Sequence, residues 1–231
     1  MTKVKRIVCL ANSVKIGGRC IAGREVLNNG HFGEWVRPVS ARPTAEVTFL
    51  EYKYQNNTSP KVLDIIDVPL LEAAPHGHQT ENHIINPERW WEKVDELPWN
   101  RLEQLQERPR SLWINSDSTD AGAFNCISRT EASSLNNSLV LIKKKKFGLE
   151  ISSTSWQGRK KKAYRGNFKY KGIYYSLSVT DPVARNAFKE KPEGEYPMED
   201  VYLCISLTEP WDKDNNRCHK LIAAIIGDPP L

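Results

Sequence analysis

Short strand-like runs separated by turn signals recur along this sequence, and they restrict its possible folds more than any other feature does. Runs that alternate apolar and polar residues, or are rich in branched side chains, cover residues 5–11, 19–26, 33–39, 46–52 and 62–71. The pattern resumes over residues 139–144, 147–155, 163–170, 173–180, 201–207 and 219–226. Several short strands joined by turns are typical of small Greek-key barrels. The sequence therefore predicts a mainly β protein with a few short helices.

Helix signals are confined to three places. Residues 86–94 and 97–107 are predicted to form two short helices, the first of them capped by Asn86. Residues 181–189 are predicted to form a third, with Asp181 as its cap and a proline at the first helical position.

The strand pattern also divides the chain. We expect one barrel over residues 1–130, with a helical insertion near residues 86–108, and a second barrel with a basic surface over residues 131–231. A polar break at Asn136-Asn137 lies close to that boundary.

Composition excludes several classes of protein. With 231 residues, of which 39% are hydrophobic and 26% charged, the chain has the make-up of a folded globular protein. Its most apolar run, residues 221–226, is far shorter than a transmembrane helix. The apolar run near the N-terminus is too short to be the core of a signal peptide. We therefore expect a cytoplasmic protein that has no membrane contact.

The cysteines support a reducing compartment. They are odd in number and mostly flanked by apolar residues: Cys9, Cys20, Cys126, Cys204 and Cys218. Buried free thiols explain this pattern best. No CxxC motif occurs, so neither a zinc site nor another cofactor is expected.

Charge is distributed unevenly along the chain. Residues 1–130 hold sixteen basic and sixteen acidic residues, so the whole net charge of +5 arises after residue 130. Between residues 143 and 171 there are eleven basic residues against the single acid Glu150. A segment this basic favours an anionic partner, and the rest of the C-terminal half is net acidic.

Aromatic residues are interleaved with these cations on predicted strands. Cations neutralise phosphates, and exposed rings stack on bases, which together suit single-stranded nucleic acid. The predicted nucleic-acid-binding residues are Lys143, Lys144, Lys145, Lys146, Trp156, Arg159, Lys160, Lys161, Lys162, Tyr164 and Arg165. The alternative is that the rings are core and the lysines a solvated edge. Both interpretations must hold for part of the segment, because side chains alternate between the two faces of a strand. Phe168 and Tyr170 share one face, and Lys169 and Lys171 share the other, so these rings and lysines cannot form one surface.

A second set of polar residues lies in the first half of the chain. Arginine takes phosphate or guanine, and the amides of glutamine and asparagine read a base edge. A possible ligand pocket therefore comprises Arg19, Arg24, Arg37, Gln79 and Asn82. Buried salt bridges of Arg24 or Arg37 with Glu25, Glu46 or Glu81 explain the same residues without a ligand.

Signals for catalysis are weak. His76 and His78 have no partner motif and are expected on a surface turn. Asp64 and Asp67 are an odd number of positions apart on a predicted strand, so they face opposite sides. No complete catalytic or metal motif occurs, which favours a binding protein over an enzyme. Trp90, Trp91 and Trp113 are assigned to packing.

Six segments together resemble the bacterial family described as dual OB-containing domains. They cover residues 4–13, 18–25, 35–40, 64–70, 78–82 and 178–182. The resemblance implies two OB-like small β-barrels packed together, with presumed nucleic-acid binding and a setting in prokaryotic conflict systems.

The favoured hypothesis is thus a module that binds single-stranded or structured RNA or DNA, in a bacterial defence or repair system. One alternative is a nucleotide or modified-base sensor or enzyme that uses the pocket in the N-terminal half. Another is a protein-interaction subunit of a larger complex, whose lysines dock on an acidic partner.

Overall fold

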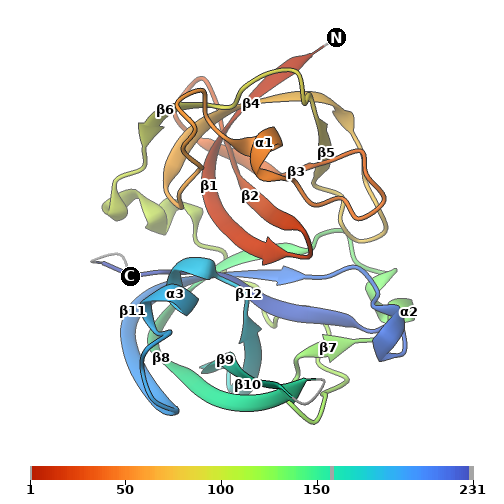
Figure 1. The fold of residues 1–231 in the computed structure, drawn as a ribbon, viewed down its shortest axis with the longest axis vertical. Coiled ribbons are helices and arrows are strands. Elements are labelled where there is room, and N and C mark those ends of the chain that lie inside the picture. The colour runs from red at the N-terminus through yellow and green to blue at the C-terminus, as the bar shows by residue number, and fades with distance from the viewer. Residues whose placement is uncertain (1, 157–158, 229–231) are drawn as a thin grey trace. The chain divides into compact units, whose positions relative to one another are not determined.

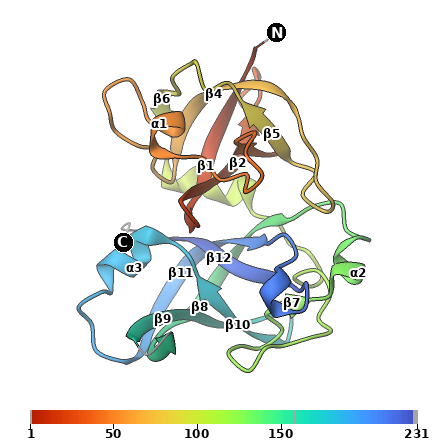
Figure 2. The same ribbon diagram turned by 45° about the vertical axis from the view of Figure 1, so that its right-hand side comes forward.

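The computed structural model describes residues 2–156 and 159–228, without the side chains of residues 155–160. Two compact units divide the chain, residues Met1–Gln106 and Glu107–Leu231 (Figures 1 and 2). Each unit contains one six-stranded sheet and a few short helices, which confirms the predicted mainly β fold.

The first unit is built on a ring of five strands. In chain order its elements are β1 (Lys3–Lys15), β2 (Gly18–Val26), β3 (Phe32–Val39), α1 (Phe49–Tyr52), β4 (Asp64–Ala73), β5 (Asn82–Ile85), β6 (Glu92–Glu96) and the 3-10 helix η1 (Trp99–Leu105). The strands pair in the order β1-β2-β3-β5-β4, and β4 pairs back onto β1. Only the pair β3–β5 in this ring is parallel. The sheet therefore closes on itself, and β6 adds to the edge of β4.

The second unit repeats this topology. Its elements are β7 (Cys126–Ile127), α2 (Arg129–Ala132), β8 (Leu139–Trp156), β9 (Arg159–Tyr170), β10 (Ile173–Val179), α3 (Pro182–Ala187), β11 (Gly194–Leu207), the 3-10 helix η2 (Asp212–Asp214) and β12 (Cys218–Ile226). The ring runs β8-β9-β10-β12-β11 and back to β8, again with one parallel pair, β10–β12. In both units a short helix links the third strand of the ring to the fourth. This is the five-stranded Greek-key order of an OB fold.

Each ring encloses its own apolar core. Alternating residues of the first ring, such as Ile7, Val36 and Ile66, are fully buried. The second core contains more aromatic side chains than the first. In it Phe168 stacks on Tyr175, with 5.6 Å between the ring centroids. Inward-facing residues of all five strands supply these cores, as the closure of the ring requires.

The division between the units falls earlier than the predicted boundary after residue 130. Residues 107–130 belong to the second unit because they pack on its ring of strands. Leu112 lies in the second core and donates its backbone N–H to the Tyr175 hydroxyl, 3.3 Å away. The fully buried ammonium of Lys220 donates to the carbonyl of Ile114 at 2.7 Å and to Oδ1 of Asn115 at 2.9 Å.

Lys220 makes the stability of the second unit dependent on pH. Burial lowers the pKa of this ammonium from 10.5 to about 8. Because the unfolded chain then binds more protons than the folded one, stability rises with pH between these two values. From about pH 7.5 to about pH 9.5 we expect a gain of about 2 kcal/mol. Buried thiols such as Cys126 and Cys218, whose pKa burial raises, lower stability over the same pH range, so the contribution of Lys220 is measured as a difference between two proteins. Urea unfolding at both pH values should show that the free energy of unfolding of the wild type rises by this amount relative to that of Lys220→Met. Equal pH dependence of the two proteins would contradict the assignment.

Three local predictions were wrong. Residues 86–94 form no helix, because Asn86 Oδ1 accepts from the N–H of Glu88 in a turn and β6 then pairs with β4. Within residues 46–52, predicted as a strand, Thr48 and Glu51 form a capping box that starts α1. The two strands predicted over residues 139–155 are one continuous strand, β8.

Other local predictions were confirmed. Residues 97–107 contain the 3-10 helix η1. Asp181 caps α3 through Oδ1, which accepts from the backbone N–H groups of Val183 and Ala184. All five cysteines are free, and four of them are buried.

Candidate nucleic-acid interface

The predicted nucleic-acid-binding residues lie on β8 and β9, which pair as an antiparallel hairpin in the second unit. Lys143, Lys145, Lys146, Lys161 and Lys162 are exposed. Lys144, Tyr164 and Arg165 are half-buried. The side chains of Trp156, Arg159 and Lys160 lie outside the described residues.

Strand alternation sorts the side chains of β9 onto two faces. Phe168 and Tyr170 point into the core and are buried. The opposite face carries Lys161, Arg165 and Lys169, which are four residues apart. A strand rises about 3.3 Å per residue, so successive cations of this row are about 13 Å apart. One strand therefore presents three positive charges on one face.

The neighbouring strand β10 adds an exposed aromatic ring to the same face. Tyr174 is 46% exposed, whereas the next residue, Tyr175, is fully buried. In the antiparallel register Tyr174 is opposite Lys169, and Ser178 is opposite Arg165. We call the outward face formed by Lys161, Arg165, Asn167 and Lys169 of β9 and by Tyr174, Ser176 and Ser178 of β10 the β9–β10 face.

The nucleic-acid-binding residues predicted from the sequence include Tyr164 but not Tyr174. Tyr164 packs against the second core, with the guanidinium of Arg185 6.0 Å from its ring centroid. The signal for Tyr174 was present in the sequence, since one of two adjacent tyrosines on a strand must face outward when the other is core. Which of the two faces outward depends on the strand's register.

Arg165 has hydrogen-bonding capacity to spare on this face. It is opposite Glu150 in the β8–β9 register, but the carboxylate of Glu150 accepts its hydrogen bond from Asn167, at 2.8 Å. Burial lowers the pKa of the Arg165 guanidinium. Its Nη1 is buried and has no hydrogen-bond partner among the described residues. A buried donor without a partner gains a hydrogen bond when the guanidinium turns outward to an acceptor such as a phosphate oxygen.

Several other lysines of the basic segment are engaged within the protein. The ammonium of Lys162 donates to the carbonyls of Lys189 and Lys191, and that of Lys144 donates to the carbonyl of Lys169. The Nζ atom of Lys143 lies 5.4 Å from the ring centroid of Tyr202.

Acidic residues of β11 also lie next to the basic segment. Glu199 is directly opposite Lys146, and Glu195 is opposite Glu150. The density of positive charge in the sequence therefore overstates the charge of the surface along β8.

The predicted pocket of the first unit is a buried polar network. The guanidinium of Arg37 is 3.1 Å from the carboxylate of Glu81, and its Nη1 donates to Oδ1 of Asn82 at 3.3 Å. Asn82 in turn donates to Oε1 of Gln79. All four residues are at most 6% exposed. These residues therefore stabilise one another.

The two remaining residues of that set lie elsewhere. Arg24 donates to the carbonyl of Gly33 at 2.6 Å, and its guanidinium is 5.8 Å from the ring centroid of Trp35. Arg19 lies at the start of β2, where its backbone pairs with Val47.

The two aspartates considered for catalysis have structural partners. Asp64 accepts from the hydroxyl of Tyr54 at 2.8 Å and is 2.6 Å from the ammonium of Lys93. Asp67 forms an ion pair with Arg6. Within residues 2–156 and 159–228, no group of three or more His, Cys, Asp or Glu side chains is placed to hold a metal ion. In the same ranges, no helix has the length and apolarity needed to span a bilayer.

Comparison with known proteins assigns the chain to a family. A family model described as "Dual OB-containing domain" matches residues 5–225, which is nearly the whole chain. The searches of curated proteins and of solved structures returned no match. The match agrees with the two rings of strands, which share one topology. The chain therefore belongs to the family of dual OB-containing domains.

Proposed function

We propose that the protein binds single-stranded nucleic acid on the β9–β10 face of its second unit. One observation carries the proposal, namely that Tyr174 is exposed directly beside Lys169 on the outward face of two neighbouring strands. OB folds bind oligonucleotides on the face of the second and third strands of the ring, which are β9 and β10 in this unit.

The chemistry of the face matches a single strand. Lys161, Arg165 and Lys169 supply positive charges along β9 for successive phosphates, and the Tyr174 ring supplies a flat surface for a base. Ser176 and Ser178 add hydroxyl groups that donate and accept hydrogen bonds. None of these groups reads a defined base sequence, so we expect little sequence preference.

Binding across a salt series tests the proposal. A labelled single-stranded oligonucleotide of mixed sequence should bind the full chain at low salt, and log K should fall linearly with log salt concentration. Three phosphate contacts predict a slope of about −2 for a single strand. Absence of binding at low salt, or a duplex that binds more tightly than the single strand, would contradict the proposal.

Removal of the Tyr174 ring should weaken binding at every salt concentration. Stacking of one base contributes about 1–3 kcal/mol, so Tyr174→Ala should raise the Kd by about tenfold or more without changing the salt slope. Tyr174→Phe keeps the ring and serves as the matched control, with a Kd close to that of the wild type. Equal affinities of the alanine and phenylalanine variants would show that Tyr174 does not stack on a base.

We further propose a cytoplasmic location and a role in bacterial defence or repair. The free state of all five cysteines supports a reducing compartment. Support for the defence or repair role comes only from the setting that the family resemblance implies.

A further inference from the structure

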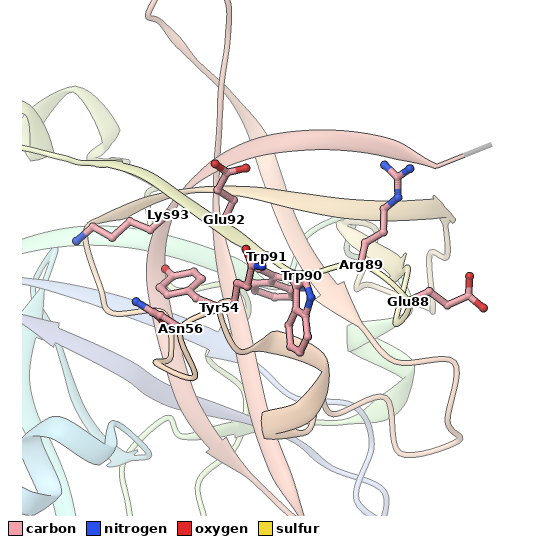
Figure 3. A pocket seen from close by; sticks show the side chains of 9 residues that line it. Tyr54, Asn56, Glu88, Arg89, Trp90, Trp91, Glu92 and Lys93 are labelled. Carbon is pink, nitrogen blue, oxygen red and sulfur yellow. The ribbon is translucent and has the colours of Figure 1, made fainter.

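A hollow of about 590 Å³ opens on the first unit, between the loop that follows α1 and the segment that leads into β6 (Figure 3). Tyr54 and Asn56 line it from the loop, and Arg89, Trp90 and Trp91 line it from the segment before β6. Tyr54 and Trp91 pair through an isolated bridge, which holds the two walls together. We call it the Trp90 hollow.

Trp90 and Trp91 lie side by side in the sequence, but their exposures differ. Trp90 is 51% exposed, contrary to its assignment to packing, and the ammonium of Lys53 is 4.9 Å from its ring centroid. Trp91 is only 1% exposed, and its indole Nε1 has no hydrogen-bond partner among the described residues. The hollow thus combines the exposed ring of Trp90 with an indole N–H that is buried in its wall and lacks an acceptor.

Charge at the hollow is balanced, which argues against a phosphate as its ligand. Among the lining residues Arg89 and Lys93 are matched by Glu88 and Glu92, and the cation Lys53 beside Trp90 is matched in number by Asp64, which contacts Lys93. Lys93 is also held by Asp64, at 2.6 Å, and its hydrogen bond to that carboxylate raises its pKa. The hollow therefore suits an uncharged group.

Polar side chains at the hollow can serve both donors and acceptors. The amide of Gln55 carries a donor and an acceptor, and Asn56 adds its NH2 donor, because its Oδ1 accepts from the backbone N–H and the hydroxyl of Thr58. A flat, uncharged ligand whose edge carries donors and acceptors fits this lining, and a nucleobase has all three properties.

We propose that the Trp90 hollow binds one nucleobase, stacked on Trp90 and hydrogen-bonded along its edge. The choice of a nucleobase among flat ligands rests on the proposed function, because single-stranded nucleic acid exposes its bases. The first unit then binds a base without a phosphate contact, whereas binding on the β9–β10 face is mainly electrostatic.

Uncharged nucleosides test the hollow separately from the basic surface. Titration of the full chain with each common nucleoside, at high salt and followed by isothermal titration calorimetry, should give a saturable change with at least one of them. Trp90→Ala should weaken that binding by about tenfold or more, and Trp90→Phe should retain most of it. Trp211→Ala is the matched control, since Trp211 is 46% exposed and lies outside the hollow.

The outcomes separate the two proposals. Lys161→Glu with Lys169→Glu should leave nucleoside binding unchanged, although it should weaken binding of an oligonucleotide. No saturable change with any nucleoside, or a change that persists in Trp90→Ala, would overturn the hollow as a base site. Saturation by a neutral oligosaccharide but by no nucleoside would overturn it as well. Either result leaves the salt-dependent binding of an oligonucleotide as a separate test of the β9–β10 face.

Discussion

Reversal of the two exposed charges of the β9 row, Lys161→Glu with Lys169→Glu, should weaken binding to a single-stranded oligonucleotide by about 100-fold at low salt. Each substitution removes a cation that faces a phosphate and adds a repulsive anion. Loss of two phosphate contacts should also make the log–log salt slope less steep by about 1.4. Fluorescence anisotropy with a labelled oligonucleotide measures both quantities. The fold should be retained, because both side chains are exposed.

A matched control separates position from net charge. Lys61→Glu with Lys213→Glu makes the same change of charge at exposed lysines outside β8 and β9. This control should reduce binding only slightly, since its charges do not lie on the β9–β10 face. Equal losses in the two double variants would mean that the oligonucleotide responds to overall charge, and the proposed face would then be wrong.

Loss of one partner from the buried ion pair of the first unit should destabilise the protein by about 3–5 kcal/mol. In Glu81→Leu the guanidinium of Arg37 stays buried without its carboxylate, which was 3.1 Å away. The pair itself is a weak source of stability, because the desolvation of two charges offsets their attraction. Replacement of both partners, Arg37→Met with Glu81→Leu, should therefore recover most of the loss. Urea unfolding monitored by tryptophan fluorescence gives these free energies.

A less buried pair provides the comparison. Lys5 and Glu25 are 2.9 Å apart, but their side chains are 28% and 26% exposed. Glu25→Gln should thus cost no more than about 1 kcal/mol. A similarly small cost for Glu81→Leu would contradict the structural role of the network.

A mononucleotide that raises the melting temperature of the wild type but not of Arg37→Met would instead support the ligand pocket predicted from the sequence.

The ring of strands could be predicted in outline because strand formation leaves a local signal. The apolar runs that became β1, β2 and β12 are explicit in the sequence, as is the Asp181 cap of α3. Closure of each ring by pairing of its first and fourth strands depends on contacts between distant segments. The number of short strands and the family resemblance both indicated barrels, but neither showed which strands pair.

The errors arose where tertiary contacts override local preference. Pro87 and the residues after it carry a helix-start signal, but pairing with β4 draws Glu92–Glu96 into a strand. The domain boundary was placed too late because no local signal shows that residues 107–125 pack on the second ring. Their anchor, Lys220, is a charged residue that sequence reasoning places on the surface.

Prediction of the candidate site was partial for a similar reason. Alternation along β9 correctly separates the buried rings Phe168 and Tyr170 from the exposed Lys169. It does not reveal that Glu199 lies across from Lys146, or that Lys162 donates to backbone carbonyls, because those partners are distant in the chain. Charge density along the sequence therefore points to the second unit, and cross-strand register defines the proposed face.

Photo-cross-linking locates the bound strand most directly. The full chain, bound to a single-stranded oligonucleotide that carries a photoreactive iodouracil, is irradiated, and the cross-linked peptides are identified by mass spectrometry. The proposed interface predicts a cross-link at Tyr174, lost in Tyr174→Ala, whether or not a second one forms at Trp90. Cross-links confined to residues outside β9 and β10 would contradict nucleic-acid binding on the β9–β10 face.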